Sequence, residues 1–159
     1  MTKTTEITSK LWEMANKLRG TMDASEYKNY ILPFMFYRYL SEHQDDYIRK
    51  NGLEDFYQNP EDIEEYYEDI ARSLGYVIEP QFTWTAIVDS IENHKIKASD
   101  FQDMFEAFHK HAKRNSDSEQ EFANVFFDVN LGDTRLGSGT NERAKALNDI
   151  VLMINEFDF

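Results

Sequence analysis

Apolar residues recur every three or four positions along most of the chain, and this spacing is typical of amphipathic helices. Between residues 76 and 84 the apolar positions alternate around a proline instead, which predicts an extended connection or a short edge strand. The expected fold class is therefore all-α: a helical bundle of about six to eight helices with at most one short extended or hairpin segment. The helical stripes cover residues 7–18, 23–42, 60–74, 84–91, 101–108 and 140–154.

Residues that favour helix ends lie between these stripes. Gly20 and Gly75 follow apolar stripes and predict C-terminal stops, because glycine adopts the left-handed conformation without strain. Thr83 and Ser99 precede stripes and predict N-caps, since their hydroxyls can accept a hydrogen bond from the first helical turn. Thr140 is expected to open the last helix.

The second stripe differs from the others because residues 30–40 are apolar on almost every side of a helix. A helix of this kind belongs at the centre of a bundle. Pro33 interrupts it and predicts a bend, because proline removes one backbone hydrogen bond. Arg38 lies in the same run, and a buried charge without a partner is strongly destabilising. We therefore expect Arg38 to be buried and paired, with a structural ion pair favoured over a direct contact with phosphate.

Length and composition restrict the class of protein. The 159 residues amount to about one domain, which we take to span residues 1–159. The chain has no cysteine, which excludes disulfides and cysteine-ligated zinc and makes a cytoplasmic location the default. The longest apolar run, residues 30–37, is far shorter than the roughly 20 residues that cross a bilayer, so no membrane span is expected.

Charge is distributed unevenly around a net value of −13. Residues 41–92 hold three Lys and Arg against fourteen Asp and Glu, and this segment would repel DNA. Residues 93–115 hold five against three, with Lys110, Lys113 and Arg114 at their end. These three are the first candidates for contact with DNA or a partner protein, because local positive charge attracts phosphate even on an acidic domain. The further candidates are Lys17, Arg19, Lys28, Arg135 and Arg143.

Sequence motifs for catalysis, cofactors and metals are missing. The glycine-rich loop before residue 140 has Ser138 where a phosphate-binding loop needs lysine, so it is interpreted as a plain turn. His109 and His111 would diverge by about 200° on a helix and cannot share a metal, and we expect both on solvated helix surface. Glu106 and His109 form one Glu-x-x-His pair, whereas di-iron bundles need two. We expect no catalytic, cofactor-binding or metal-binding residue in this chain.

One stretch is specific enough to indicate a family. Residues 11–42 contain a Leu-Arg-Gly-x-Met turn, an Asp-x-x-Glu-Tyr-Lys helix start and an Arg-Tyr-Leu-Ser-Glu helix end. The stretch resembles the N-terminal helical domain of the modification subunit of type I restriction-modification systems, which are DNA adenine methyltransferases that work with a specificity subunit. Weaker agreement continues through Pro80, Trp84 and residues 134–151, so the resemblance covers essentially the whole chain.

The resemblance implies that a catalytic domain using S-adenosylmethionine follows this chain in the parent protein. Neither a glycine motif for that cofactor nor an Asn-Pro-Pro-aromatic motif for a flipped adenine is present. The stretch most similar to the second motif is residues 59–62, which have Glu61 in place of the second proline. The resemblance also implies an accessory role, in which the domain helps two modification subunits and one specificity subunit close around duplex DNA. A restriction subunit is a further partner that the family allows.

Composition alone leaves a second function open. A free-standing acidic interaction protein, or a DNA mimic that occupies a DNA-binding partner through spaced carboxylates, would carry a similar charge. A DNA mimic would inhibit a DNA-binding enzyme in competition at low salt, and an accessory domain would not. The signature at residues 11–42 favours the family domain, and the absence of a glycine or proline stop before Phe159 leads us to expect a longer parent protein.

Overall fold

The chain folds into a helical bundle in the computed structural model, which describes residues 24–58, 60–115, 122, 126, 129, 131 and 139–156, with the backbone alone described for residues 24–29 and 98. These residues form five α-helices, slightly fewer than expected, and no strand, which confirms the all-α prediction. The helix predicted at residues 7–18 and the glycine-rich loop lie outside the described residues. The elements are α2 (Ala24–Asn51), η1 (Glu54–Gln58), α3 (Ile63–Leu74), η2 (Pro80–Phe82), α4 (Trp84–Glu92), α5 (Ala98–Ala112) and α7 (Thr140–Asn155), where η marks a 3₁₀ helix.

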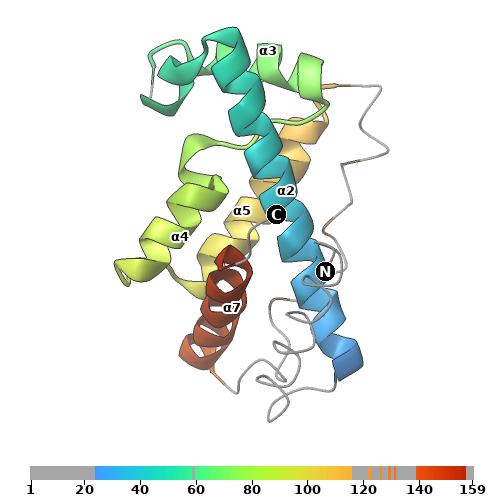
Figure 1. Ribbon diagram of the computed structural model, residues 1–159, viewed down its shortest axis with the longest axis vertical. Helices are drawn as coiled ribbons and strands as arrows, with labels where there is room; N and C mark the ends of the chain where they lie inside the picture. The colour runs from blue at the N-terminus through green and yellow to red at the C-terminus, as the bar shows by residue number, and fades with distance from the viewer. Residues whose placement is uncertain are drawn as a thin grey trace, which may run out of the picture.

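Helix α2 runs along the long axis of the molecule, with α4, α5 and α7 packed beside it and α3 near its end (Figure 1). Pro33 lies inside this helix of 28 residues without ending it. The prediction that α2 is the buried spine is largely confirmed, because one side of the helix carries five buried apolar residues. They are Tyr30, Ile31, Phe34, Tyr37 and Leu40. The expectation that every side is buried is wrong, because Leu32, Phe36 and Tyr39 are exposed.

Two hydrophobic cores stabilise the bundle. The larger core joins α2 to α4, α5 and α7, and it is rich in aromatic edge-to-face contacts such as that between Phe34 and Phe101, whose ring centroids are 5.7 Å apart. The smaller core lies where α2 ends and joins it to η1 and α3. Its central side chain is Phe56, which packs edge-on against Tyr67. The apolar stripe predicted at residues 60–74 is therefore confirmed as the buried side of this acidic segment.

Helix ends follow the sequence signals at most positions. Thr83 caps α4 by accepting a hydrogen bond from the backbone N–H of Ala86, and Gly75 ends α3 with a left-handed φ of 90°. The predicted Ser99 cap is wrong, because α5 already begins at Ala98. The backbone N–H of Lys97 instead donates to the Asp100 carboxylate at 2.7 Å, which satisfies one of the free donors at this helix start.

Three buried polar side chains form a row along α2 at intervals of three residues: Arg38, Ser41 and Gln44. Each one bonds to the backbone of a different element. Arg38 donates to the carbonyl oxygen of Ile154 at 2.6 Å, and Ser41 accepts from the backbone N–H of Trp84 at 2.8 Å. The Gln44 amide pairs with both backbone groups of Ile78, in the extended connection between α3 and η2. This polar row fastens three parts of the fold onto α2: α7, α4 and the extended connection between α3 and η2.

Candidate nucleic-acid and partner interface

The basic residues predicted to contact DNA or protein are concentrated at the C-terminal end of α5. Lys110 and Lys113 are both exposed, and their spacing of three residues places them on one side of the helix end. Arg114 follows them in sequence, but its side chain is only 16% exposed.

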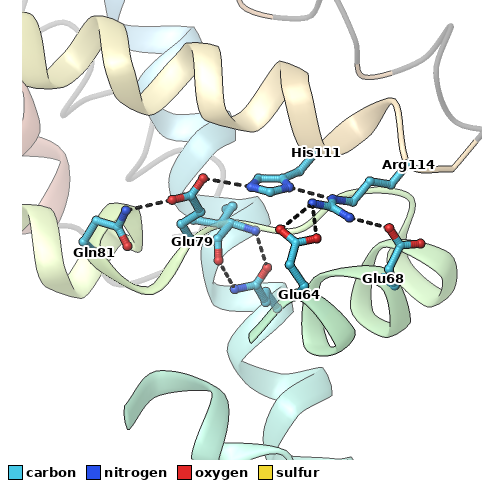
Figure 2. Close-up of polar contacts among 8 residues, drawn as sticks. Glu64, Glu68, Glu79, Gln81, His111 and Arg114 are labelled. Carbon is cyan, nitrogen blue, oxygen red and sulfur yellow. Dashed lines mark hydrogen bonds and ion pairs between the residues drawn. The ribbon is translucent and has the colours of Figure 1, made fainter. Parts of the chain in front are cut away.

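Arg114 turns inward and binds two carboxylates of α3 (Figure 2). One terminal nitrogen of its guanidinium donates to Glu64 Oε2 at 2.9 Å, and the other donates to Glu68 Oε1. The guanidinium carbon also lies 5.5 Å from the centre of the Tyr67 ring, a cation–π distance. The charge of Arg114 is therefore compensated within the chain, so this residue differs from the two lysines that precede it.

His111 links Arg114 to Glu79, which lies in the extended segment between α3 and η2. Its side chain is almost fully buried, and its Nδ1 accepts a hydrogen bond from Arg114 Nε at 2.9 Å. Its Nε2 lies 2.8 Å from Glu79 Oε2, and the other oxygen of Glu79 accepts from the side-chain amide of Gln81. The contacts of Glu79, His111 and Arg114 form a continuous polar chain between α5 and its neighbours (Figure 2).

The expectation that His109 and His111 lie on solvated surface is wrong, because both side chains are buried. The Nε2 of His109 accepts a hydrogen bond from the backbone N–H of Phe126 at 3.1 Å. Burial lowers the pKa of His109 below its usual range, and the positive charge of Lys113 lowers it further. A signal for His111 was present in the sequence, since it continues the helical spacing of the buried residues Met104 and Phe108.

The remaining predicted basic residues fall into three groups. Arg38 is buried, and its Nε donates to Glu42 Oε1 at 2.8 Å, so it is paired inside the bundle. Arg143 lies near the start of α7, and in Figure 1 that end of α7 is well separated along the long axis from the last turn of α5. The side chain of Lys28 and all of Lys17, Arg19 and Arg135 lie outside the described residues.

An exposed stripe on α2, formed by Leu32, Phe36 and Tyr39, was not anticipated from the sequence. These side chains are 52%, 38% and 61% exposed and follow at helical intervals of four and three residues. The Phe36 and Tyr39 rings are stacked with centroids 6.4 Å apart, and the ring of His43 stacks on the other side of Tyr39. A row of large apolar side chains on a surface is typical of a binding site for protein.

The part of the chain that the structure describes shows neither a metal cluster nor a membrane-spanning helix. That part contains no cluster of three or more His, Asp or Glu side chains arranged to hold a metal ion. None of its helices combines the length and apolar character that crossing a membrane requires. Glu106 is exposed and accepts a hydrogen bond from Gln102, one turn earlier on α5.

Comparisons with known proteins identify relatives of the whole chain. Residues 7–154 match the family model described as the HsdM N-terminal domain. The methylase subunit of the type I restriction enzyme MpnII from Mycoplasma pneumoniae is 29% identical over 164 residues, which cover 96% of this chain and 30% of that protein. The fold is similar to that of a type I restriction-modification methyltransferase subunit from Streptococcus thermophilus, with a TM-score of 0.82 and 23% identity over 99% of this chain and 35% of that one. The chain spans about a third of the length of these two proteins.

Proposed function

Because the chain belongs to the HsdM N-terminal domain family, we propose that it is the accessory helical domain of a type I DNA adenine methyltransferase. The match over residues 7–154 carries this assignment. Its role is to contact the specificity subunit and the second modification subunit while the cytoplasmic complex closes around duplex DNA. Methyl transfer from S-adenosylmethionine is assigned to the catalytic domain of the parent subunit, because the sequence of this chain has no motif for that cofactor.

The exposed stripe of α2 is the proposed contact for the specificity subunit. Its three side chains are uncharged, so they would neutralise no phosphate, whereas aromatic side chains are enriched at the centres of protein interfaces. The stripe lies on α2, and the polar row binds this helix to α4, to α7 and to the extended connection between α3 and η2. A force applied to α2 by a partner would therefore be transmitted to most of the bundle.

Contact with DNA is assigned to Lys110 and Lys113 at the end of α5. Both are exposed, and phosphate contacts need charge and reach but no base-specific geometry. Arg114 is left out of this surface because Glu64 and Glu68 already bind its guanidinium. The acidic face of α3 nearby would restrict the DNA backbone to the side of α5 on which the lysines lie.

The protein contact is tested in the assembled complex by changing two exposed residues of the stripe, Leu32→Ser and Tyr39→Ser. Substitutions at such exposed positions usually change stability by less than about 0.5 kcal/mol each. We expect capture of the methylase subunit by a tagged specificity subunit to weaken at least tenfold. The matched control is Gln102→Ser with Asp103→Ser, two exposed positions on α5. Equal capture of both double variants would contradict the assignment.

The DNA contact is tested with Lys110→Ala and Lys113→Ala in the same complex. The slope of log affinity against log salt concentration is negative, and each lost phosphate contact reduces its magnitude by about 0.9. The double variant should therefore reduce the magnitude by up to about 1.8. Affinity should fall equally for specific and non-specific duplexes, because phosphates carry no sequence information. Lys95→Ala with Lys97→Ala removes the same charge elsewhere on the surface and is the control. The assignment fails if both double variants show the parental salt slope.

A further inference from the structure

The polar chain between α5 and α3 depends on a single buried imidazole. His111 stands between Glu79, which it contacts through Nε2, and Arg114, which it contacts through Nδ1. Arg114 in turn bridges to Glu64 and Glu68 of α3 (Figure 2). Three separate parts of the fold therefore meet through one titratable ring.

The contacts of the ring determine its protonation state. Arginine carries a hydrogen on Nε at every accessible pH, so the nitrogen that accepts from Arg114 Nε must hold a lone pair. That nitrogen is Nδ1 of His111, and the proton of the neutral ring is therefore on Nε2. From there it is donated to Glu79 Oε2 at 2.8 Å. The geometry requires a neutral His111 with one defined tautomer.

Protonation of His111 would remove one of these two contacts. A proton on Nδ1 would face the Nε–H of Arg114 across 2.9 Å, so two donors and two positive charges would oppose each other. The contact with Glu79 would be kept and strengthened, because it would become an ion pair. We propose that His111 is a protonation-sensitive latch: in its neutral form it holds the Nε–H of Arg114, and in its charged form it releases Arg114 from the ring.

The groups that face His111 act on its charge in opposite directions. Burial lowers the pKa of His111 below its ordinary value of 6.5, and the charges of Arg114 and Lys110 on α5 lower it further. Glu79 raises it through its hydrogen bond and its charge, without reversing the shift. Tyr67 of α3, whose ring centre is 4.5 Å from that of the imidazole, stays neutral because burial raises its pKa to about 12.

The direction of the pH dependence follows from this lowered pKa. Below pH 6.5 the unfolded chain binds a proton at this histidine more readily than the folded chain does. The stability contributed by the latch is therefore complete above pH 6.5 and is lost as the pH falls toward the folded pKa. Asn115 would keep α5 attached to α3 after release, because its side-chain amide donates to the carbonyl oxygens of Ala71 and Arg72.

The latch is tested by nitrogen NMR on the uniformly labelled chain. At pH 7.5 we expect the ring nitrogens of His111 to show the neutral Nε2–H tautomer, and the Nε–H of Arg114 to give a protected signal. On acidification, the protection of that Nε–H, measured as its exchange rate relative to a free arginine at the same pH, should fall at least tenfold. The midpoint of this loss should coincide with that of the His111 titration. A charged ring or an Nδ1–H tautomer at pH 7.5 would overturn the proposal. So would a protection of the Arg114 Nε–H that stays unchanged through the titration of His111.

Two variants separate the latch from a general effect of acid. In His111→Gln the side-chain amide can still accept from Arg114 and donate to Glu79, but it cannot be protonated. Its Arg114 signal should persist to about pH 5, where carboxylates in general begin to titrate. His109→Gln removes the other buried histidine of α5 and should leave the acid release of Arg114 in place. Release of Arg114 at the parental midpoint in His111→Gln would contradict the proposal. If that variant does not fold, the titration of the parent chain decides the question by itself.

Discussion

Replacing Arg38 by methionine tests how the end of α7 is held. Methionine keeps an unbranched apolar stem against the core, so the change removes the guanidinium with little loss of packing. The change removes two contacts whose contributions can be compared. The first is the hydrogen bond from a terminal guanidinium nitrogen to the carbonyl oxygen of Ile154, which is buried, and the second is the ion pair with Glu42.

The two contacts should contribute very different amounts. The carbonyl of Ile154 belongs to the last turn of α7, so the charged donor interacts with both this oxygen and the negative end of the helix dipole. A hydrogen bond from a charged group contributes about 1.5–3 kcal/mol, and the dipole adds about 0.3–1 kcal/mol. Glu42 is 48% exposed, so water solvates its carboxylate once Arg38 is gone, and the lost pair costs only about 0.5 kcal/mol. Arg38→Met should therefore lower the free energy of unfolding by about 2–4.5 kcal/mol.

Urea unfolding of the parent, Arg38→Met and Glu42→Gln measures these contributions. Glu42→Gln removes the charge of the partner and keeps the Ile154 contact, so it should cost less than about 1 kcal/mol. If Glu42→Gln costs as much as Arg38→Met, the ion pair and not the helix end is what Arg38 stabilises. If Arg38→Met changes stability by less than about 1 kcal/mol but weakens DNA binding of the assembled enzyme, Arg38 contacts phosphate and the reasoning is refuted.

Two further substitutions test single elements of the fold by urea unfolding. Gln44→Met should cost about 2–5 kcal/mol, because it leaves two buried backbone groups of Ile78 unpaired, and a cost below about 1 kcal/mol would show that water replaces the amide. His94→Gly should stabilise the chain by about 0.5 kcal/mol, since His94 has a left-handed φ of 56° just after α4 and glycine relieves that strain at a smaller entropic cost. A loss of stability in His94→Gly would mean that the imidazole itself makes a stabilising contact.

Local features of this fold could be predicted because their physical cause lies within a few residues of sequence. The cap at Thr83 needs only a hydroxyl beside the first turn of α4, and the stop at Gly75 needs only a residue that tolerates positive φ. Ser99 shows the limit of this reasoning. It is a good capping residue, but Asp100 reaches back to the N–H of Lys97, and the helix begins before Ser99 is reached.

Features of the candidate interface were predicted less well because they depend on residues far apart in sequence. Arg114 was grouped with Lys110 and Lys113 by its position, yet its partners Glu64 and Glu68 lie 50 and 46 residues earlier. The exposed stripe of α2 shows the opposite case. A helix that is apolar on every side is expected to be covered on every side, and the arrangement of the segments that pack against it determines which side is left open.

The polar row of α2 supplies hydrogen-bond partners for backbone groups of the elements that pack against this helix. Each side chain in the row bonds to backbone groups that regular structure leaves without a partner: a carbonyl in the last turn of α7, the first N–H of α4, and both groups of Ile78 in a connection without a strand partner among the described residues. Apolar packing is non-directional, so it would tolerate small shifts of α2 along or about its axis. Hydrogen bonds to fixed backbone groups would not, because the interaction weakens steeply with angle and distance. The register of α2 is therefore set by Arg38, Ser41 and Gln44. More generally, polar residues at intervals of three in an otherwise apolar helix predict hydrogen bonds to neighbouring backbone groups, even when the sequence does not identify those groups.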